Sequence, residues 1–339
     1  MNDVAVIGAG AWGTALAIVV GRNGNQRVRL WAYEPEVCSA INTQHTNHAF
    51  LDGVDIPDSV RASNDFAEVL RGTETVISVM PSHHCRRLFQ QIAPHLSPET
   101  LVISATKGIE NDSCLRMSEV IDSVVHQQRG FHPRIAVISG PSFAREVARG
   151  DPTAITAASA HAELARRAQE VFGDPAFRVY THDDMAGVEL GGALKNVIAI
   201  AAGICDGLGL GYNSVAALIT RGLAEMTRLA MACGGRRETM AGLAGLGDLV
   251  LTCTGSLSRN RTVGVELGRG RKLPDIIAGM HGMVAEGVLT TTAAIGLAKS
   301  RNATMPVTEQ VYSILQHGKP PKEAMRELLS RPFTSEFAS

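Results

Sequence analysis

The stretch "VAVIGAGAWGTALAIVV", residues 4–20, decides the fold of this chain. A short apolar run typical of a buried strand comes first, and a glycine-rich turn leads directly into a run with helical character. Glycines at the spacing G-x-G-x-x-G allow a tight turn, close approach of a pyrophosphate and close packing of the helix on the strand. The start of the helix also offers amide groups to anions. The stretch therefore predicts a dinucleotide-binding Rossmann unit, with contacts from Gly8, Gly10, Ala11, Trp12 and Gly13.

Further apolar runs recur through the first half of the chain and alternate with longer helical segments. Nearly continuous apolar strands separated by helices indicate a parallel sheet covered on both faces, which is a doubly wound α/β domain. We expect strands at 4–7, 27–32, 75–80, 101–105 and 135–139, with weaker candidates at 153–158 and 177–180.

From about Val188 helical periodicity replaces the strand pattern. One helix is expected within "YNSVAALITRGLAEMTRLAMACGG", with Asn213 or Ser214 as its N-cap and two glycines after its end. A chain of 339 residues also exceeds what one hydrophobic core usually supports. We therefore predict a Rossmann domain over residues 1–187 and a helical substrate-binding and catalytic domain over residues 188–339.

The composition is that of an ordinary globular protein, with 45% hydrophobic and 19% charged residues. A formal net charge of −1 gives no electrostatic reason to expect nucleic acid or an anionic membrane as partner. The apolar run from Val188 to Ile219 is interrupted by Lys195 and Asp206, so we expect a buried helix pair and no integral membrane segment.

The cysteines and the start of the chain bear on location. The six cysteines form no C-x-x-C pair and lie near no regularly spaced histidines, so we expect neither a disulfide framework nor a metal site. A strand-like run beginning at Val4 leaves no room for a signal peptide. We expect a cytoplasmic protein.

The end of the second predicted strand bears on the choice of cofactor. A pocket that selects NAD carries an acidic residue there, which binds the ribose 2′-hydroxyl. Here the strand runs into Ala32 and Tyr33, with Glu34 a little beyond. Such a pocket tolerates a 2′-phosphate, so NADP or NAD is expected, with NADPH favoured. Arg22 and Arg29 are candidates to assist in binding the 2′-phosphate.

A reductase of a ketone must deliver a proton to oxygen as the hydride reaches carbon, and the donor is commonly His, Tyr or Lys. No Tyr-x-x-x-Lys is present, and His83 and His84 are as consistent with the surface as with a cofactor site. Lys195, within "GGALKN" (191–196), lies in apolar surroundings that would lower its pKa. In the alternative reading its stem packs on apolar surface while its amine reaches water. Because buried ionisable groups cluster at active sites, we favour catalysis.

Other candidates follow the fourth and fifth predicted strands, at the edge where open α/β sheets bind ligands. Lys107 lies in "SATKGIE", and "SGPSFAREV" contributes Gly140, Ser142 and Ala144. Ordinary loop chemistry is the alternative for each, but their shared position at strand ends favours function.

The segment "LSRNRTVG" (257–264) has a serine that would cap a helix and two arginines in its first turn. Acidic residues normally favour that turn, because the helix dipole is positive there. Arginines in their place indicate an external anion, most naturally a phosphate, although they could instead pair with acidic neighbours. The candidate residues are Ser258, Arg259 and Asn260.

Together these segments resemble the bacterial NAD(P)-dependent glycerol-3-phosphate dehydrogenases over nearly the whole chain. The resemblance rests on "GAGAWGTALA", "KGIE", "SGPSFAREV", "LGGALKNVIAIAAG", "AGLGDLVLTCTG", "SRNR" and "VAEGV". It implies a Rossmann domain followed by an all-helical domain similar to that of 6-phosphogluconate dehydrogenases, and a homodimer. It also implies reversible reduction of dihydroxyacetone phosphate to sn-glycerol 3-phosphate, which supplies phospholipid synthesis.

The resemblance also implies roles for individual residues. Lys195 would be the general acid and base, with Asp248 tuning or orienting it. The small phosphorylated substrate would contact Lys107, Gly140, Ser142, Lys195, Asp248, Ser258, Arg259 and Asn260, and Asn196 would be a further substrate-orienting amide. The cofactor would contact Tyr33, Lys107, Ala144, Arg259, Val284 and Glu286 in addition to the glycine-rich turn.

Two rival functions stay open at this point. A related reductase of another small keto acid or phosphorylated ketone would keep the glycine turn and the lysine but would lack a reason for the "SRN" anion site. A non-catalytic dinucleotide sensor would need neither Lys195 nor Asp248.

Overall fold

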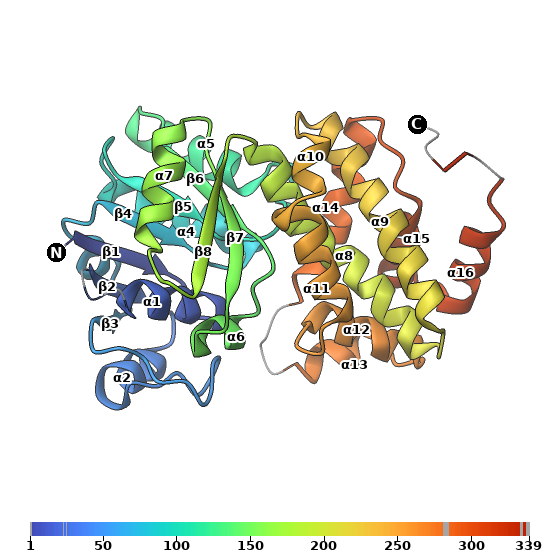
Figure 1. The fold of residues 1–339 in the computed structure, drawn as a ribbon, viewed down its shortest axis with the longest axis horizontal. Helices are drawn as coiled ribbons and strands as arrows, with labels where there is room; N and C mark the ends of the chain where they lie inside the picture. The colour runs from blue at the N-terminus through green and yellow to red at the C-terminus, as the bar shows by residue number, and fades with distance from the viewer. Residues whose placement is uncertain (1, 23, 25, 281–284, 333–334, 337–339) are drawn as a thin grey trace.

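The structure is a computed structural model that describes residues 2–22, 24, 26–280, 285–332 and 335–336. Figure 1 shows a sheet-containing half built from the N-terminal part of the chain, beside a half built from helices, with the C-terminus far from the sheet. The fold is the predicted Rossmann-type α/β sheet followed by a helical domain.

The sheet has eight strands in the order β3-β2-β1-β4-β5-β6-β7-β8. All seven expected strands are present, and a short additional strand, β3, was missed. The sheet is not wholly parallel, since β7 runs antiparallel to β6. The strands are β1 (Asn2–Ile7), β2 (Gln26–Trp31), β3 (Val60–Ser63), β4 (Thr75–Ser78), β5 (Leu101–Ser104), β6 (Arg134–Ser139), β7 (Thr153–Ala158) and β8 (Phe177–His182).

Helices cover both faces of this sheet because successive strand residues point to opposite sides. In β1, Val4 and Val6 pack into one apolar cluster, with α1, α6 and α7, while Ala5 and Ile7 pack into another, with α4 and α5. The helices of this half are α1 (Ala11–Arg22), α2 (Pro35–Gln44), α3 (Phe66–Leu70), η1 (Ser82–His84), α4 (Cys85–Ile92), η2 (Ala93–His95), α5 (Met117–Arg129), α6 (Ala144–Arg149) and α7 (Ala162–Val171).

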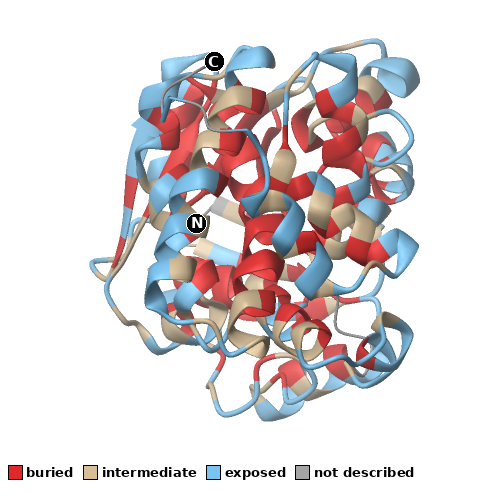
Figure 2. Cartoon of the chain, turned by 90° about the vertical axis from the view of Figure 1, so that its right-hand side faces the viewer, coloured by how far each residue is buried: buried red, intermediate tan, exposed pale blue. Residues whose placement is uncertain are grey.

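The helical half surrounds one long helix, α8 (Met185–Gly207), whose residues from Gly187 to Ile204 are all buried. The red segments in the interior of Figure 2, within a pale blue surface, show this pattern of burial. The other helices are α9 (Tyr212–Ala232), α10 (Arg237–Met240), the π-helix η3 (Leu243–Gly247), α11 (Asp248–Thr254), α12 (Arg259–Gly268), α13 (Leu273–Ala278), α14 (Glu286–Ser300), α15 (Pro306–His317) and α16 (Pro321–Leu329).

Glycines on α8 let neighbouring backbones approach it closely. A Cβ atom at Gly191 would lie 2.4 Å from the carbonyl oxygen of Ala244, and one at Gly203 would lie 2.0 Å from that of Arg261. Both distances are too short for any side chain, so these glycines allow η3 and α12 to pack against α8. The glycine-rich runs at 207–211 and 242–247 thus serve turns and close helix packing.

The N-termini of α8 and α9 have different caps, of which only the cap of α9 was predicted. Asp184 caps α8 by accepting a hydrogen bond from the amide of Gly187 at 2.8 Å. Helix α9 begins at Tyr212, with Gly211 in the N-cap position, so the prediction of Asn213 or Ser214 was wrong. Polarity alone misled here, because both residues already lie inside the first turn.

By length and composition α8 could cross a membrane, as one of at most two such candidates within the described residues. However, 94% of its most apolar window is buried inside the protein. This burial is that of a core helix, as expected from the lysine and aspartate that interrupt the run.

Candidate active site

The glycine-rich turn between β1 and α1 has the geometry that a pyrophosphate requires. Gly8 has a φ of 118°, and a Cβ atom there would lie 2.7 Å from the carbonyl oxygen of Val79. A Cβ atom at Gly13 would lie 1.8 Å from the carbonyl oxygen of Gly8. At Gly10 the same atom would meet nothing within 4 Å, so this backbone faces open space. Two glycines therefore shape the turn, and the third leaves room for a ligand.

Two further features of this turn suit an anionic dinucleotide. The first turn of α1 contains no acidic residue, so its amides and positive dipole end are open to phosphate. The indole nitrogen of Trp12 is buried without a hydrogen-bond partner. Asn47, which the sequence reading missed, supports the turn by donating to the carbonyl of Ala9 at 2.8 Å.

At the end of β2 the acidic residue typical of NAD selection is absent. Ala32 is buried and Tyr33 is 72% exposed, while Glu34 precedes α2 in its N-cap position. The two arginines considered for this pocket are engaged with other groups. Arg22 donates to the carbonyl of Ala148, and Arg29 pairs with Asp3.

The predicted catalytic lysine is buried and belongs to a four-residue cluster. Lys195 is 7% exposed, and its amine donates to one carboxylate oxygen of Asp248 and, at 2.9 Å, to the hydroxyl of Thr252. The amine of Lys107 donates to the second oxygen of Asp248 at 2.7 Å. One carboxylate from α11 thus binds a lysine from the helical half and another from the loop after β5. Thr252 was missed by the sequence reading, although it lies one helical turn after Asp248.

The environment of Lys195 makes its amine a usable acid and base near neutral pH. Burial and, to a smaller extent, the nearby charge of Lys107 lower the pKa of Lys195 to about 8, against the opposing effect of Asp248. Because Lys195 is buried and its amine is bonded to Asp248 and Thr252, the alternative in which the amine reaches water is wrong. Lys107 also lies over the ring of Trp12, with its amine 5.9 Å from the ring centroid, which links the cluster to the dinucleotide turn.

The loop after β6 contributes a strained backbone beside this cluster. Gly140 has a φ of 155°, and a Cβ atom there would lie 2.8 Å from the Cα of Ile155. Its carbonyl accepts hydrogen bonds from Ser142 at 2.8 Å and from Lys107 at 3.3 Å. Ala144 is the first residue of α6 and packs against the same apolar cluster as Ala11 and Trp12. These residues therefore lie between the lysine cluster and the dinucleotide turn.

Helix α12 begins as the sequence predicted, with the hydroxyl of Ser258 accepting from the amide of Arg261 at 3.2 Å. The two arginines of its first turn differ in their surroundings. Arg261 forms a 2.5 Å ion pair with Asp206, as the alternative reading expects. Arg259 lies in the field of Glu286, and burial lowers its pKa.

Two asparagines connect α12 to α8 and to the start of α14. The amide nitrogen of Asn260 donates to the side-chain oxygen of Asn196 at 2.9 Å, and the oxygen of Asn260 accepts from the amide of Gly287 at 2.9 Å. Asn196 follows Lys195 directly, so the start of α12 is fixed relative to the lysine. The structure thereby brings two predicted substrate residues into contact.

Glu286 opens α14 and reaches the Rossmann half. Its carboxylate accepts from the backbone amide of Ser82 at 3.1 Å and from the hydroxyl of Ser82 at 2.6 Å. Burial raises the pKa of Glu286. Val284, the other cofactor candidate of this segment, lies outside the described residues. The neighbouring His83 is exposed, and its ring lies tilted against that of His84 at 3.9 Å between ring centroids.

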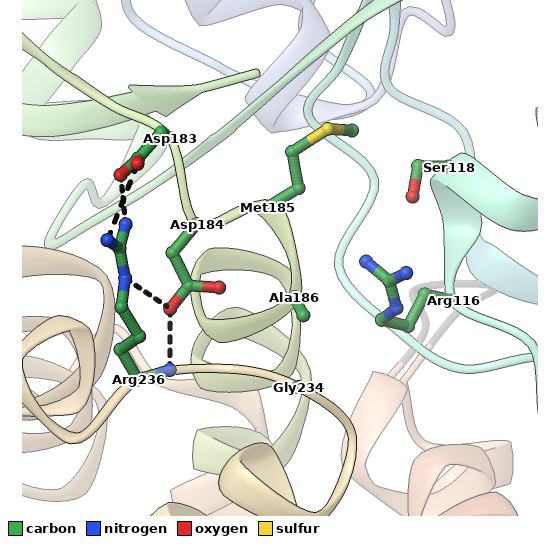
Figure 3. Close-up of a pocket in the computed structure, with 8 residues that line it drawn as sticks. All are labelled: Arg116, Ser118, Asp183, Asp184, Met185, Ala186, Gly234 and Arg236. Atoms are coloured by element: carbon green, nitrogen blue, oxygen red, sulfur yellow. Dashed lines mark hydrogen bonds and ion pairs between the residues drawn. The ribbon is translucent and has the colours of Figure 1, made fainter. Parts of the chain in front are cut away.

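A cavity of about 390 Å³ lies elsewhere, at the connection from β8 to α8 (Figure 3). Its charged groups are already engaged in ion pairs, Arg116 with Glu189 and the others as follows. Arg236 pairs with Asp183, and its backbone amide donates to Asp184 at 2.8 Å. Since the lysine cluster does not line it, this cavity is not the candidate active site. Among the described residues, no group of three or more His, Cys, Asp or Glu could hold a metal ion.

A glycine fingerprint on the first strand of a Rossmann-type sheet, facing a buried lysine and carboxylate from a helical domain, defines the chain as a nicotinamide-dinucleotide-dependent dehydrogenase. The family models for NAD-dependent glycerol-3-phosphate dehydrogenase match at residues 3–165 for the N-terminal part and 184–326 for the C-terminal part. The chain belongs to this family.

Relatives agree with the assignment over the full length. A glycerol-3-phosphate dehydrogenase [NAD(P)+] from Koribacter versatilis is 66% identical over 99% of both chains. One from Acidobacterium capsulatum is 55% identical over 99% of this chain and all of its own. The crystal structure of glycerol-3-phosphate dehydrogenase from Coxiella burnetii has a TM-score of 0.92 and 41% identity, covering 97% of this chain and 99% of its own.

Proposed function

We propose that this protein reduces dihydroxyacetone phosphate reversibly to sn-glycerol 3-phosphate with NAD(P)H, and so supplies phospholipid synthesis. The observation that carries the proposal is the pair of lysine amines on the two oxygens of Asp248. This cluster lies beside the dinucleotide turn and near the arginine-bearing start of α12. Proton transfer, cofactor binding and anion binding are thus combined at one edge of the sheet.

The cofactor is NAD or NADP, as in the family, and it supplies the hydride when bound. The residues around the turn fit it, because Gly10 faces open space and α1 begins without an acidic residue. We assign the dinucleotide to contacts from Gly8, Gly10, Ala11, Trp12, Gly13, Tyr33, Lys107, Ala144, Arg259, Val284 and Glu286. The missing carboxylate at the end of β2 supports a preference for NADPH.

In reduction, protonated Lys195 donates its proton to the C2 oxygen of the substrate, and in oxidation the neutral amine takes that proton back. A pKa near 8 suits both directions, since each form of the amine is accessible close to neutral pH. Asp248 orients the amine and stabilises its charge. Thr252 accepts a hydrogen bond from the same amine and so fixes its direction.

Substrate binding is assigned to groups around this amine. Ser258, Arg259 and Asn260 bind the phosphate at the start of α12, where the helix dipole favours an anion. Lys107, Gly140 and Ser142 bind the substrate from the Rossmann side, and Asn196 orients it next to Lys195.

The domain boundaries, the location and the oligomeric state are proposed from the resemblance to the same family. We propose a Rossmann domain over 1–187, a substrate-binding and catalytic domain over 188–339, and a cytoplasmic homodimer. Sedimentation at several concentrations measures the oligomeric state.

Two rival functions are less well supported. A related reductase of another small keto acid would not need arginine at the start of α12. A dinucleotide sensor would not need a buried lysine held by a carboxylate and a hydroxyl.

The test is oxidation of NADPH and of NADH with dihydroxyacetone phosphate, followed by absorbance, for the wild type and Lys195→Ala. Turnover that depends on Lys195 is the expected result. No turnover with this substrate overturns the assignment, and undiminished turnover in Lys195→Ala overturns the role of the lysine.

A further inference from the structure

The contact between Ser82 and Glu286 joins the two halves of the protein across 204 residues of sequence. Ser82 begins η1, four residues after β4 ends, and Glu286 begins α14. Both oxygens of the carboxylate are used, one by the backbone amide of Ser82 and one by its hydroxyl. Ser82 is only 3% exposed. A two-point hydrogen bond to a charged acceptor in such a position fixes both partners.

The location of Ser82 relative to the sheet connects it to cofactor binding. The order β3-β2-β1-β4-β5 reverses direction between β1 and β4, and ligands of open α/β sheets bind at such a point, outside the carboxyl ends of the strands. Ser82 lies on the segment that leaves β4 at that end. The same segment packs on the dinucleotide turn, because a Cβ atom at Gly8 would meet the carbonyl of Val79 at 2.7 Å.

The loop that carries Lys107 packs against the same pair. A Cβ atom at Gly108 would lie 2.3 Å from the Cβ of Ser82 and 3.4 Å from the carboxylate of Glu286. Three segments therefore meet here: the one after β4, the one after β5 and the start of α14. Lys107, the residue before this glycine, is the one that binds Asp248.

We propose that Ser82 is a positioning residue for cofactor binding, which holds Glu286 in place over the dinucleotide and keeps the loop of Lys107 and Gly108 against it. This inference rests on the proposed function. Ser82 itself takes no part in proton or hydride transfer. Its loss leaves Glu286 without the hydroxyl donor and loosens the closure of α14 over the crevice.

The first experiment is Ser82→Ala, assayed by direct fluorescence titration with NADPH and by steady-state kinetics. Loss of one hydrogen bond to a charged group predicts about a tenfold rise in the Kd and KM for NADPH. The kcat at saturating NADPH should change by less than about twofold, since the contact that is lost affects binding of the cofactor and not the chemical step. Ser97→Ala, a serine exposed at the opposite end of β5, is the matched control.

Two more variants separate positioning from a general loss of structure. Gly108→Ala should weaken NADPH binding in the same way, because its new methyl group displaces Ser82. In a double-mutant cycle, Ser82→Ala should add little to Glu286→Gln, since both changes weaken one contact. Thermal unfolding of each variant in the absence of cofactor identifies any that fail to fold.

An unchanged Kd for NADPH in folded Ser82→Ala, or fully additive effects in the cycle, would overturn the proposal. A fall in kcat with an unchanged KM for NADPH would overturn it as well. The titration needs no turnover, so failure of the proposed function appears separately, as wild-type protein that binds NADPH but does not reduce dihydroxyacetone phosphate.

Discussion

Lys195 and Asp248 form a buried ion pair between α8 and α11, and it is the carboxylate that keeps the lysine pKa from falling further. Asp248 is 1% exposed and also binds Lys107. Two amines thus share one negative charge, which leaves the cluster with a net positive charge when both amines are protonated, next to the proposed position of the substrate carbonyl. Such a charge favours the oxygen on which negative charge develops during reduction.

The first prediction concerns the pH dependence of both directions. Reduction needs Lys195 protonated, so kcat/KM for dihydroxyacetone phosphate should fall as pH rises through about 8. Oxidation of glycerol 3-phosphate needs the neutral amine, so its rate should rise over the same range. Initial rates measured from pH 6 to about 10 in constant ionic strength give both profiles. If the rates of reduction and oxidation changed in the same direction over this pH range, Lys195 would be excluded as the shared acid and base.

Asp248→Asn should move these profiles to lower pH and slow the reaction. The carboxylate raises the pKa of Lys195 and accepts from both lysine amines, whereas an asparagine is uncharged and has one acceptor oxygen. We expect the descending limb of reduction to shift toward lower pH and kcat to fall by about 100-fold. Asp183→Asn, at an exposed ion pair with Arg236, is the control. If kcat fell in Asp248→Asn while the pH profile stayed in place, Asp248 would have only a structural role.

Arg259→Ala should chiefly raise the KM for dihydroxyacetone phosphate. A static contact to the substrate phosphate acts in the ground state and the transition state alike, and a charged hydrogen bond corresponds to about a 10-fold to 100-fold effect. Arg261→Ala is the matched control in the same helical turn, because Arg261 pairs with Asp206. Steady-state kinetics of both variants decide the point. Equal effects on KM would contradict a specific anion site at Arg259.

Glu225, which lies away from the candidate active site, should make the stability of the protein depend on pH. Its carboxylate accepts from the amides of Val307 at 2.6 Å and Thr308 at 3.2 Å, yet burial raises its pKa to about 7. The folded state therefore holds a proton that the unfolded chain releases near pH 4.5. This stabilisation is complete below pH 4.5 and is lost as pH rises to about 7, an effect of at most about 3 kcal/mol.

Urea denaturation at pH 5 and pH 8 tests this, by comparing the wild type with Glu225→Gln. The glutamine cannot ionise, so the difference in free energy of unfolding between the two proteins should change with pH. A constant difference would show that Glu225 does not titrate in this range.

Much of the fold was predictable because its signals are local. Strands such as 4–7 and 101–105 are short apolar runs, and the glycine fingerprint marks the first turn from sequence alone. β3 was missed because its sequence, "VRAS", is short and half polar. The antiparallel direction of β7 could not be predicted from the sequence either, since strand direction is set by the connections and packing of the whole sheet.

The candidate site was predictable at single residues but not in its contacts. Lys195 and Lys107 stand out as lysines in apolar or strand-end positions, yet nothing local indicates that both bind Asp248. Thr252 and Ser82 carry no motif of their own, and only the packing of distant segments reveals them. Likewise Arg259 and Arg261 look equivalent in sequence, and Asp206 distinguishes them in space.

The last prediction concerns Gly203, where α12 packs on α8. A Cβ atom there would lie 2.0 Å from the carbonyl oxygen of Arg261 and 2.9 Å from the amide nitrogen of Val265. Backbone cannot move aside as a flexible side chain can, so Gly203→Ala should lower the free energy of unfolding by about 1 to 3 kcal/mol.

Because the same displacement moves the start of α12, the KM for dihydroxyacetone phosphate should rise too. Gly279→Ala, at an exposed glycine with a φ of −74° where a Cβ atom would lie 3.5 Å from the carbonyl oxygen of Ile276, is the control and should change neither quantity appreciably. Denaturation and kinetics of the two variants, made in parallel, measure both effects. If Gly203→Ala were as stable as the control, the close approach of α12 to α8 would not be what holds Asn260 against Asn196.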